Sequence, residues 1–209
     1  MITRWWWIRH APVTSHGGRI YGQGDVDADC GEAAPFVALA GLLPANAVWI
    51  ASHLRRTHQT AAAIATAGDG KLPELVIEPG LAEQHFGDWQ GLTHAELAAR
   101  PDAAAHRFWL APAHIAPPGG ESFEDLVARV GAAVGRITAH HAGRDLVAVA
   151  HGGTIRAALA LALDLAPDRA LGFSIDNCSL TRLDHIAPAE AGPAQWRIVA
   201  VNRHPGRLA

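Results

Sequence analysis

Residues 146–153 read Leu-Val-Ala-Val-Ala-His-Gly-Gly, an apolar run of strand length that stops on a histidine followed by two small residues. Residues 5–11, Trp-Trp-Trp-Ile-Arg-His-Ala, show the same pattern towards the other end of the chain. Short apolar runs of this kind are typical of buried strands in a parallel sheet. Ligands of open α/β sheets bind just beyond the carboxyl ends of such strands. The two segments therefore predict that His10 and His151 meet over one substrate.

The rest of the chain alternates apolar runs with helical patterns. Strands are expected over residues 3–9, 47–51, 74–78, 145–150, 178–183 and 195–201. The clearest helix begins at Ser122, an N-cap candidate with Asp125 three residues later, and carries one apolar stripe as far as Gly143. Shorter helices are expected over 56–67 and 153–163. This order predicts an α/β fold, a three-layer sandwich in which a mostly parallel central sheet carries helices on both faces.

The length of 209 residues suits a single domain, 1–209. Residues 83–120 are rich in Pro, Gly, His and Trp, and we expect them to form an insertion of short helices and loops over the carboxyl edge of the sheet. Residues that recognise the released part of a substrate would lie there. Trp109, His106 and Arg107 are candidates, with aromatic packing as the alternative explanation.

Composition excludes several classes of protein. The net charge of −3 argues against a general nucleic-acid or anionic-membrane binder, because such surfaces need an excess of Lys and Arg. No apolar stretch reaches the ~20 residues that span a bilayer. Cys30 and Cys178 are the only cysteines, so neither a disulfide framework nor a zinc site is expected. We expect a cytoplasmic protein without nucleic-acid or membrane partners, and the sequence does not indicate an oligomeric state.

Four groups with chemical potential follow predicted strands: Arg9 with His10, the Ser52 to Arg56 segment, Glu83, and His151. Each alone has an ordinary structural explanation, such as a solvated arginine or a hydrogen-bonded histidine. Together they supply imidazoles, guanidinium groups and a carboxylate at one edge of the sheet, which is typical of an active site.

This set fits phosphoryl transfer, which depends mainly on positioning and positive charge. Guanidinium groups match phosphate oxygens, a neutral imidazole attacks phosphorus, and a second, protonated histidine would neutralise the developing charge. The carboxylate would donate a proton to the leaving oxygen and later take one from water. Other candidates fit less well: the acidic run 25–29 lacks the Gly and Glu of a calcium loop, and neither cysteine has the arginine of a cysteine-dependent phosphatase.

Five ordered blocks of sequence resemble the histidine phosphatase superfamily, which has the phosphoglycerate-mutase-like fold. The blocks are Arg9-His10-Ala11, Ser52-x-Leu54-x-Arg56-x-x-Gln59-Thr60-Ala61, Leu81-x-Glu83-x-x-Phe86-Gly87-Asp88-Trp89-x-Gly91, Gly119-Gly120-Glu121-Ser122 and Ala150-His151-Gly152-Gly153. The resemblance implies roles for particular residues. His10 would be the nucleophile that becomes phosphohistidine, and Glu83 the general acid, with Asp88 as a weaker substitute. Arg9, Arg56 and His151 would form the phosphate pocket, and no metal or organic cofactor would be needed.

The first block departs from the family pattern. Ala11, Val13 and His16 stand where the family usually has Gly, Thr and Asn, so the phosphate contacts of that threonine and asparagine do not carry over. Gln23 is a candidate replacement as a phosphate ligand, or else an ordinary loop glutamine.

The resemblance implies a phosphatase acting on a small phosphate ester, because the chain lacks the extra segments by which the glycolytic mutases exclude water. The Glu83 block and the Phe173-x-x-Asp176-x-x-Ser179 segment are similar to α-ribazole-5′-phosphate phosphatases of cobalamin assembly. The alternatives are a phosphoglycerate-mutase-type phosphotransferase and a non-catalytic module that binds a phosphorylated ligand.

Overall fold

The computed structural model describes residues 1–68, 70–100, 106–188 and 192–206. Its centre is a six-stranded sheet with the strand order β3-β2-β4-β1-β5-β6. The strands are β1 (Ile2–Arg9), β2 (Val48–Ala51), β3 (Leu75–Ile77), β4 (Asp145–Ala150), β5 (Leu180–Ile186) and β6 (Gln195–Arg203). All six lie where the apolar runs predict them, with ends shifted by a few residues.

The strand directions confirm a mostly parallel sheet. β4 pairs in parallel with β1 on one side and with β2 on the other, and β2 pairs in parallel with β3. β5 runs antiparallel to both β1 and β6. The predicted strand over 178–183 begins later than expected because Cys178 has a left-handed backbone (φ 57°), outside the extended region that a regular strand needs.

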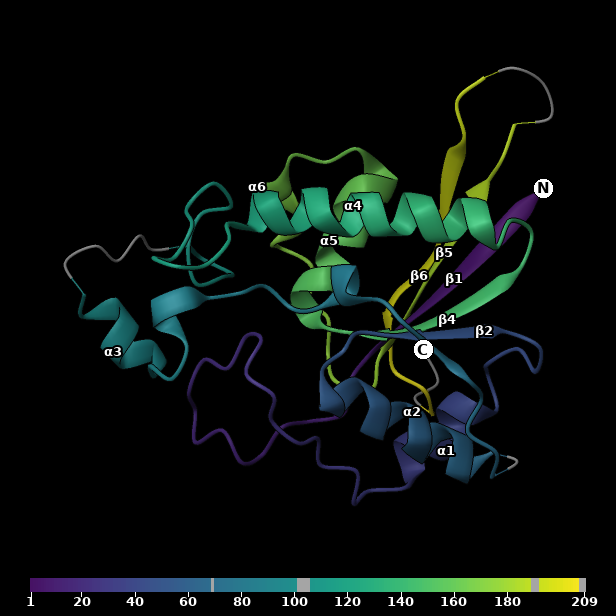
Figure 1. Ribbon diagram of the computed structural model, residues 1–209, viewed down its shortest axis with the longest axis horizontal. Helices are drawn as coiled ribbons and strands as arrows, with labels where there is room; N and C mark the ends of the chain where they lie inside the picture. Colours follow the sequence, from purple (N-terminus) through teal and green to yellow (C-terminus); the bar gives the residue numbers. More distant parts are fainter. Residues whose placement is uncertain (69, 101–105, 189–191, 207–209) are drawn as a thin grey trace.

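Helices cover both faces of the sheet, which confirms the three-layer architecture (Figure 1). One face carries α1 (Ala34–Ala40) and α2 (Arg55–Ala67), and the other carries α4 (Phe123–His140), α5 (Gly152–Leu163) and α6 (Pro167–Ala170). Alternate residues of β1 point to opposite faces, so Trp5 and Trp7 pack with α4 and α5, whereas Ile8 packs with α1 and α2. Both tryptophans are fully buried and their rings stack 4.7 Å apart.

Two helix ends test the local predictions. At the start of α4, Ser122 and Asp125 form the expected capping box, each side chain accepting a hydrogen bond from the other residue's backbone N–H. The helix ends at His140, before Gly143. Helix α1 is not predicted from the sequence, because its seven residues give only two buried apolar positions, Phe36 and Leu39.

The described parts of the segment 83–120, residues 83–100 and 106–120, contain little regular structure. After the short 3₁₀ turn η1 (Pro79–Leu81) come a second turn, η2 (Gly87–Trp89), and α3 (His94–Ala98). These lie beside the sheet and helices, at the left of Figure 1. A small apolar cluster holds them, and it contains Ile20, Phe86, Trp89, Leu97 and Ala111.

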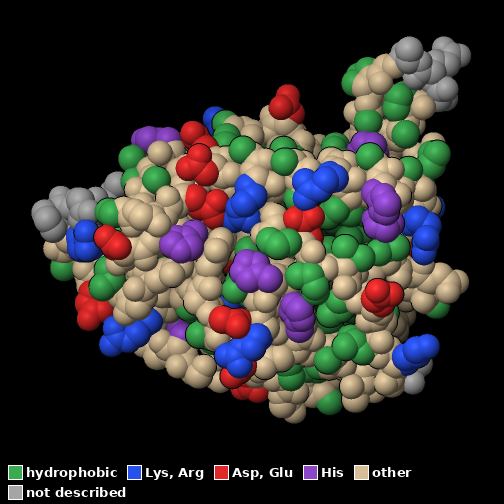
Figure 2. Space-filling view, in the orientation of Figure 1, with side chains coloured by type: hydrophobic (Ala, Val, Ile, Leu, Met, Phe, Trp, Pro, Cys, Tyr) green, Lys and Arg blue, Asp and Glu red, His purple; other side chains and the backbone are tan. Residues whose placement is uncertain are grey.

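The surface seen in Figure 2 mixes acidic, basic and histidine side chains, and no large patch of one charge covers this face. Among the described residues, no helix has the length and apolar character needed to cross a membrane.

Candidate active site

The parallel pairing of β1 and β4 brings the two predicted histidines together. The two strands end in register, with Arg9 opposite Ala150, so His10 and His151 follow side by side. Their rings lie 5.2 Å apart, centroid to centroid, at an angle of 60°. Both side chains are buried, with 1% and 0% of their surface exposed. The expected meeting of the two strand ends is therefore confirmed.

His10 is held as a neutral imidazole with one nitrogen free. Its Nδ1 lies 2.7 Å from the carbonyl oxygen of Ala11. Because a carbonyl only accepts, Nδ1 carries the proton and Nε2 keeps its lone pair. Burial, followed by the charges of Arg56 and Arg9, lowers the pKa of His10 to about 3. At neutral pH this side chain is an uncharged nitrogen nucleophile.

His151 is neutral as well. Its Nδ1 accepts a hydrogen bond from Nε of Arg56 (3.3 Å), and its Nε2 lies 2.8 Å from Oγ of Ser52. Since a guanidinium only donates, the proton of this imidazole is on Nε2, which donates to the serine. Burial and the neighbouring Arg56 hold the pKa of His151 well below its usual value. In the unliganded site this imidazole is therefore uncharged, and its protonation during phosphoryl transfer stays a prediction.

Arg56 is fixed before any substrate arrives. Its side chain is fully buried, and its terminal nitrogens donate to the carbonyls of Gly24 (2.8 Å) and Gly22 (2.6 Å). The ring of Tyr21 lies 5.1 Å from the guanidinium carbon, within cation–π range. Gly22 has a left-handed backbone (φ 43°), and a Cβ there would lie 2.8 Å from the carbonyl oxygen of Gln84, so only glycine fits.

Arg9 has a donor without a partner. Its Nη1 donates to the carbonyl of Ile175 (2.6 Å), but its Nε is buried and has no hydrogen-bond partner among the described residues. Asn177, two residues further on, donates to the carbonyl of His10 (2.8 Å) and so ties the same loop to the nucleophile. A buried N–H on a cation is costly unless an acceptor reaches it, which favours an anionic ligand at this point.

Glu83 lies at the start of α5. Its carboxylate accepts from the backbone N–H of Gly153 (3.0 and 3.3 Å) and of Gln84 (3.0 Å). A Cβ on Gly153 would overlap Oε1 of Glu83, so this close approach requires glycine. Asp88, the weaker candidate for the acid, is exposed and does not line the cavity beside the histidines.

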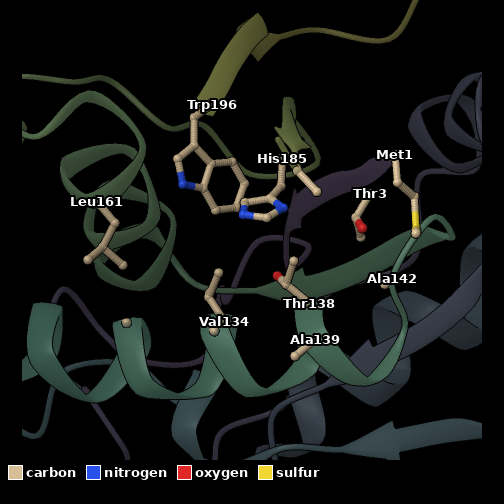
Figure 3. Close-up of a pocket in the computed structure, with 12 residues that line it drawn as sticks. Met1, Thr3, Val134, Thr138, Ala139, Ala142, Leu161, His185 and Trp196 are labelled. Carbon is tan, nitrogen blue, oxygen red and sulfur yellow. The ribbon is translucent and has the colours of Figure 1, made fainter. Parts of the chain in front are cut away.

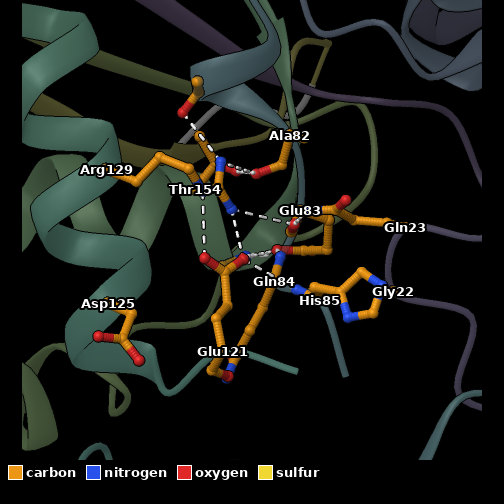
Figure 4. Close-up of polar contacts among 12 residues, drawn as sticks. Gly22, Gln23, Ala82, Glu83, Gln84, His85, Glu121, Asp125, Arg129 and Thr154 are labelled. Carbon is orange, nitrogen blue, oxygen red and sulfur yellow. Dashed lines mark hydrogen bonds and ion pairs between the residues drawn. The ribbon is translucent and has the colours of Figure 1, made fainter. Parts of the chain in front are cut away.

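The backbone before and at Glu83 is hydrogen-bonded to α4 through Arg129 and to α5 through Thr154, which donates to the carbonyl of Ala82 (2.9 Å) (Figure 4). Arg129 of α4 donates to the carbonyls of Gly80 (3.0 Å), Ala82 (3.2 Å) and Glu83 (3.3 Å), and it also donates to the carboxylate of Glu121 (2.5 Å). Gln23 donates from Nε2 to the same carbonyl of Glu83 (2.9 Å). The structure thus places Gln23 beside the acid; its role as a phosphate ligand stays a prediction.

Sequence reasoning gave no role to several of these groups. Arg129 and Asn177 fix site residues from a distance in the sequence, and nothing in their local patterns marks them. Ser52 lies in one of the five sequence blocks, but its contact with His151 joins residues far apart in the sequence. Arg156 carries one usable signal. It lies four residues after Gly152 on α5, a spacing that puts both on one face of the helix, next to His151.

A cavity of about 550 Å³ opens from this site. Its lining joins Arg9 and Glu83 to aromatic and basic side chains of the segment 83–120, including Phe86, Arg107 and Trp109. Val13 and His16, which replace the usual polar residues of the first sequence block, line it too.

A second cavity of about 450 Å³ lies at the amino ends of β1 and β4 (Figure 3). Met1, Thr3 and Val134 line it, and Trp196 covers His185 with 4.9 Å between ring centroids. His185 is its one titratable side chain among the described residues that line it. No group of three or more potential metal ligands gathers anywhere in the described ranges.

The sequence and fold of the chain were compared with those of known proteins. The family model of the histidine phosphatase superfamily (branch 1) matches residues 5–203. The chain belongs to the histidine phosphatase superfamily. The resemblance seen in the five sequence blocks is confirmed.

Two mycobacterial relatives illustrate the range of the superfamily. The chain is 37% identical to the bifunctional protein Rv2228c of Mycobacterium tuberculosis over 151 residues, and the match spans 72% of this chain but 40% of that protein. It is 36% identical to the glucosyl-3-phosphoglycerate phosphatase of the same organism, over 91% of this chain and 90% of the relative.

Solved structures agree with the fold. The native structure of mycobacterial glucosyl-3-phosphoglycerate phosphatase Rv2419c superposes with a TM-score of 0.81 at 30% identity, covering 97% of this chain and all of that one (100%). A putative α-ribazole-5′-P phosphatase from Escherichia coli superposes with a TM-score of 0.76 over 99% of both chains. At 21% identity, this second likeness shows the fold alone.

Proposed function

We propose that the protein is a metal-independent phosphatase that hydrolyses a small phosphomonoester through a phosphohistidine on His10. One observation carries the proposal: the buried His10 is neutral, its Nε2 has a free lone pair, and it lies 5.2 Å from His151 beside two arginines. A neutral imidazole nitrogen is a competent nucleophile towards phosphorus, and fixed positive charge is what the transferred group requires.

Phosphoryl transfer to His10 and hydrolysis of the phosphohistidine need only the site's own side chains and water. Nε of Arg9 and the two N–H groups that Arg56 does not spend on His151, Gly22 and Gly24 bind the phosphoryl oxygens. Nε2 of His10 forms the bond to phosphorus as the ester oxygen leaves and takes a proton from Glu83. A water molecule then attacks the phosphohistidine and gives a proton back to Glu83, which releases phosphate and neutral His10.

His151 assists from its Nε2–H, which donates to Ser52 in the unliganded site. A phosphate dianion brings two negative charges next to this imidazole, which opposes the effect of Arg56 on its pKa. The histidine can then donate a hydrogen bond to a phosphoryl oxygen as charge builds up in the transition state.

We further propose that residues 1–209 act as one domain in which the segment 83–120 forms the wall that receives the released part of the substrate. Phe86, Arg107 and Trp109 of this segment line the cavity beside the histidines, which supports that role. Candidate substrates are α-ribazole 5′-phosphate, of cobalamin biosynthesis, and glucosyl-3-phosphoglycerate, the substrate named for a relative at 36% identity. The proposed compartment is the cytoplasm, since the thiols Cys30 and Cys178 are both free.

The test is phosphate release from p-nitrophenyl phosphate and from both candidate esters, in the presence of EDTA. We expect activity in the wild type that survives EDTA and disappears in His10→Ala. Loss of activity in EDTA, or full activity of His10→Ala, would contradict the mechanism. If added glycerol took up more phosphoryl groups than water, the site would be a phosphotransferase. Tight binding of an ester without turnover would indicate a binding module.

A further inference from the structure

Arg156 presents a guanidinium that the proposed mechanism does not use. Its carbon lies 4.7 Å from the centre of the Trp109 ring, and its Nε donates to the carbonyl of Phe173 (2.8 Å). Trp109 is itself fixed, because its indole N–H donates to Oε1 of Gln84 (2.9 Å). The Trp109 ring and the carbonyl of Phe173 therefore hold the guanidinium by one face and by Nε. Its two terminal nitrogens have no hydrogen-bond partner in the part of the chain that the structure describes.

Arg156 and Arg9 converge on the start of α5. A Cβ built on Gly152 would lie 3.2 Å from Nη1 of Arg156 and 3.5 Å from Nε of Arg9. Within the described ranges, neither arginine forms an ion pair with a carboxylate. Burial, and then the charge of Arg9, lower the pKa of Arg156 to about 10, so it stays charged at neutral pH. Two half-buried cations side by side favour an anion between or beside them.

The charges at the site exceed what one phosphate needs. Arg9 and Arg56 carry two positive charges, which match a phosphate dianion. Glu83 is the one carboxylate among the described residues that line the cavity, and it is uncharged when it acts as the acid. Of the further arginines near the cavity, Arg19 pairs with Glu96, whereas Arg107 and Arg156 form no ion pair among the described residues. Once Glu83 is uncharged, Arg156 is therefore a cation without a counterpart. It stands against Trp109, in the wall that receives the released part of the substrate, so the missing charge belongs on that part.

We propose that Arg156 is a specificity-determining residue that binds a carboxylate on the released part of the substrate, with Trp109 as the flat surface behind it. This inference rests on the proposed phosphatase function and names the class of its substrate: a phosphomonoester whose alcohol also carries a carboxylate. A guanidinium binds a carboxylate through two parallel hydrogen bonds, which the two free terminal nitrogens of Arg156 can supply. An ester whose alcohol is uncharged, such as α-ribazole 5′-phosphate, would leave this cation unpaired.

The experiment compares 3-phosphoglycerate with glycerol 3-phosphate, two esters that differ only by a carboxylate in place of a hydroxymethyl group. We expect the wild type to prefer 3-phosphoglycerate by at least about ten-fold in kcat/KM. Arg156→Gln should lose about ten- to a hundred-fold on 3-phosphoglycerate, mainly through KM, and less than about three-fold on glycerol 3-phosphate and p-nitrophenyl phosphate. Arg156→Lys should keep part of the preference for 3-phosphoglycerate, because lysine keeps the positive charge but cannot form the two parallel hydrogen bonds of a guanidinium.

Arg136→Gln is the matched control, since it removes one positive charge from an exposed side chain of α4 that pairs with Glu78. It should leave all three substrates unchanged. An equal loss of Arg156→Gln on all three would overturn the proposal and assign Arg156 to the transferred phosphoryl group. A wild type without preference for the carboxylate would overturn it as well.

The two proposals fail in different ways. Hydrolysis of p-nitrophenyl phosphate that depends on His10 tests the phosphatase function alone. If turnover is absent, calorimetric titration of His10→Ala with both esters still tests Arg156. Tighter binding of 3-phosphoglycerate that is lost in the His10→Ala/Arg156→Gln double variant supports the carboxylate site, and equal binding of both esters contradicts it.

Discussion

A cavity with a histidine lies at each end of the strands, at the carboxyl edge and at the amino edge of the sheet. The two cavities differ in chemistry. The cavity at the carboxyl ends of β1 and β4 measures about 550 Å³, and arginines and the carboxylate of Glu83 line it. The cavity at the amino ends of the same strands measures about 450 Å³, and His185 in it faces Trp196 and small helical residues. Volume is similar, so volume does not distinguish a catalytic site from a packing gap.

What distinguishes the two edges is charge whose position is fixed by the backbone. At the carboxyl edge, the carbonyls of Gly22 and Gly24 fix Arg56, and the N–H of Gly153 fixes Glu83. Such groups need no rearrangement when a transition state forms, which is the main source of electrostatic catalysis. At the amino edge, burial alone lowers the pKa of His185.

The largest expected difference between the edges is the response to loss of a histidine. His10→Ala should lower kcat by about 10⁴-fold or more, because no other group in the site can accept the phosphoryl group. His185→Ala, the matched change at the amino edge, should stay within about two-fold of wild type. Steady-state kinetics with p-nitrophenyl phosphate checks both variants, and similar losses in the two would contradict the assignment of the carboxyl edge as the site.

Glu83→Gln tests the acid at the carboxyl edge. General acid catalysis contributes about 10²- to 10⁴-fold, so kcat for an alkyl ester such as glycerol 3-phosphate should fall by that factor. The loss should be much smaller for p-nitrophenyl phosphate, whose leaving group needs little protonation. Folding of the variant is checked by its melting temperature. An equal loss on both substrates would remove Glu83 from the role of acid.

The buried neutral imidazoles also predict how stability depends on pH. The pKa of His10 is about 3 in the folded protein and about 6.5 in the unfolded chain, and that of His151 is lowered in the same direction. Below pH 6.5 the unfolded state therefore binds more protons, and the free energy of unfolding falls as the pH falls.

Each histidine contributes up to about 1.4 kcal/mol per pH unit between pH 6.5 and its folded pKa. Urea unfolding at pH 7, 6 and 5 should show this slope in the wild type and a shallower one in His10→Gln. Parallel curves for the two proteins would show that His10 is not buried in its neutral form.

The smallest expected effects come from two glycines. Gly153→Ala, at the carboxyl edge, forces a Cβ against Glu83 and Leu126. It should lower the free energy of unfolding by about 1–3 kcal/mol, and it should also lower the activity. Gly135→Ala, in α4 beside the amino-edge cavity, meets no atom within 4 Å. It should raise stability by about 0.5–1 kcal/mol and leave kcat unchanged. Thermal unfolding measures both, and a Gly135→Ala variant that loses activity would contradict the comparison.

Much of the fold could be predicted from local patterns, because strands and long helices leave a periodic signal. The buried runs before His10 and His151 and the capping box at Ser122 are of this kind. Helix α1 was missed since it is too short to show a stripe. The direction of β5 was not predicted either, because an apolar run does not say which way its strand runs.

The candidate site was predicted where the chemistry follows a strand end and was missed where it depends on tertiary contacts. His10, His151, Arg56 and Glu83 are adjacent in space as their positions in the sheet require. The protonation of His151 could not be foreseen, since it depends on Arg56 donating to Nδ1, a contact between residues 95 positions apart. Arg156 and its stacking on Trp109 are long-range contacts of the same kind.

The place of β1 in the middle of the sheet has a consequence for biosynthesis. Its neighbours β4 and β5 lie more than a hundred residues downstream, so Trp5 and Trp7 have no partner strand when they leave the ribosome. At about 5–20 residues per second, roughly 7 to 30 s pass before β4 emerges. During that interval the nascent chain exposes its most aromatic segment, which favours aggregation on rapid overexpression. Slower translation at low temperature should then raise the yield of folded enzyme.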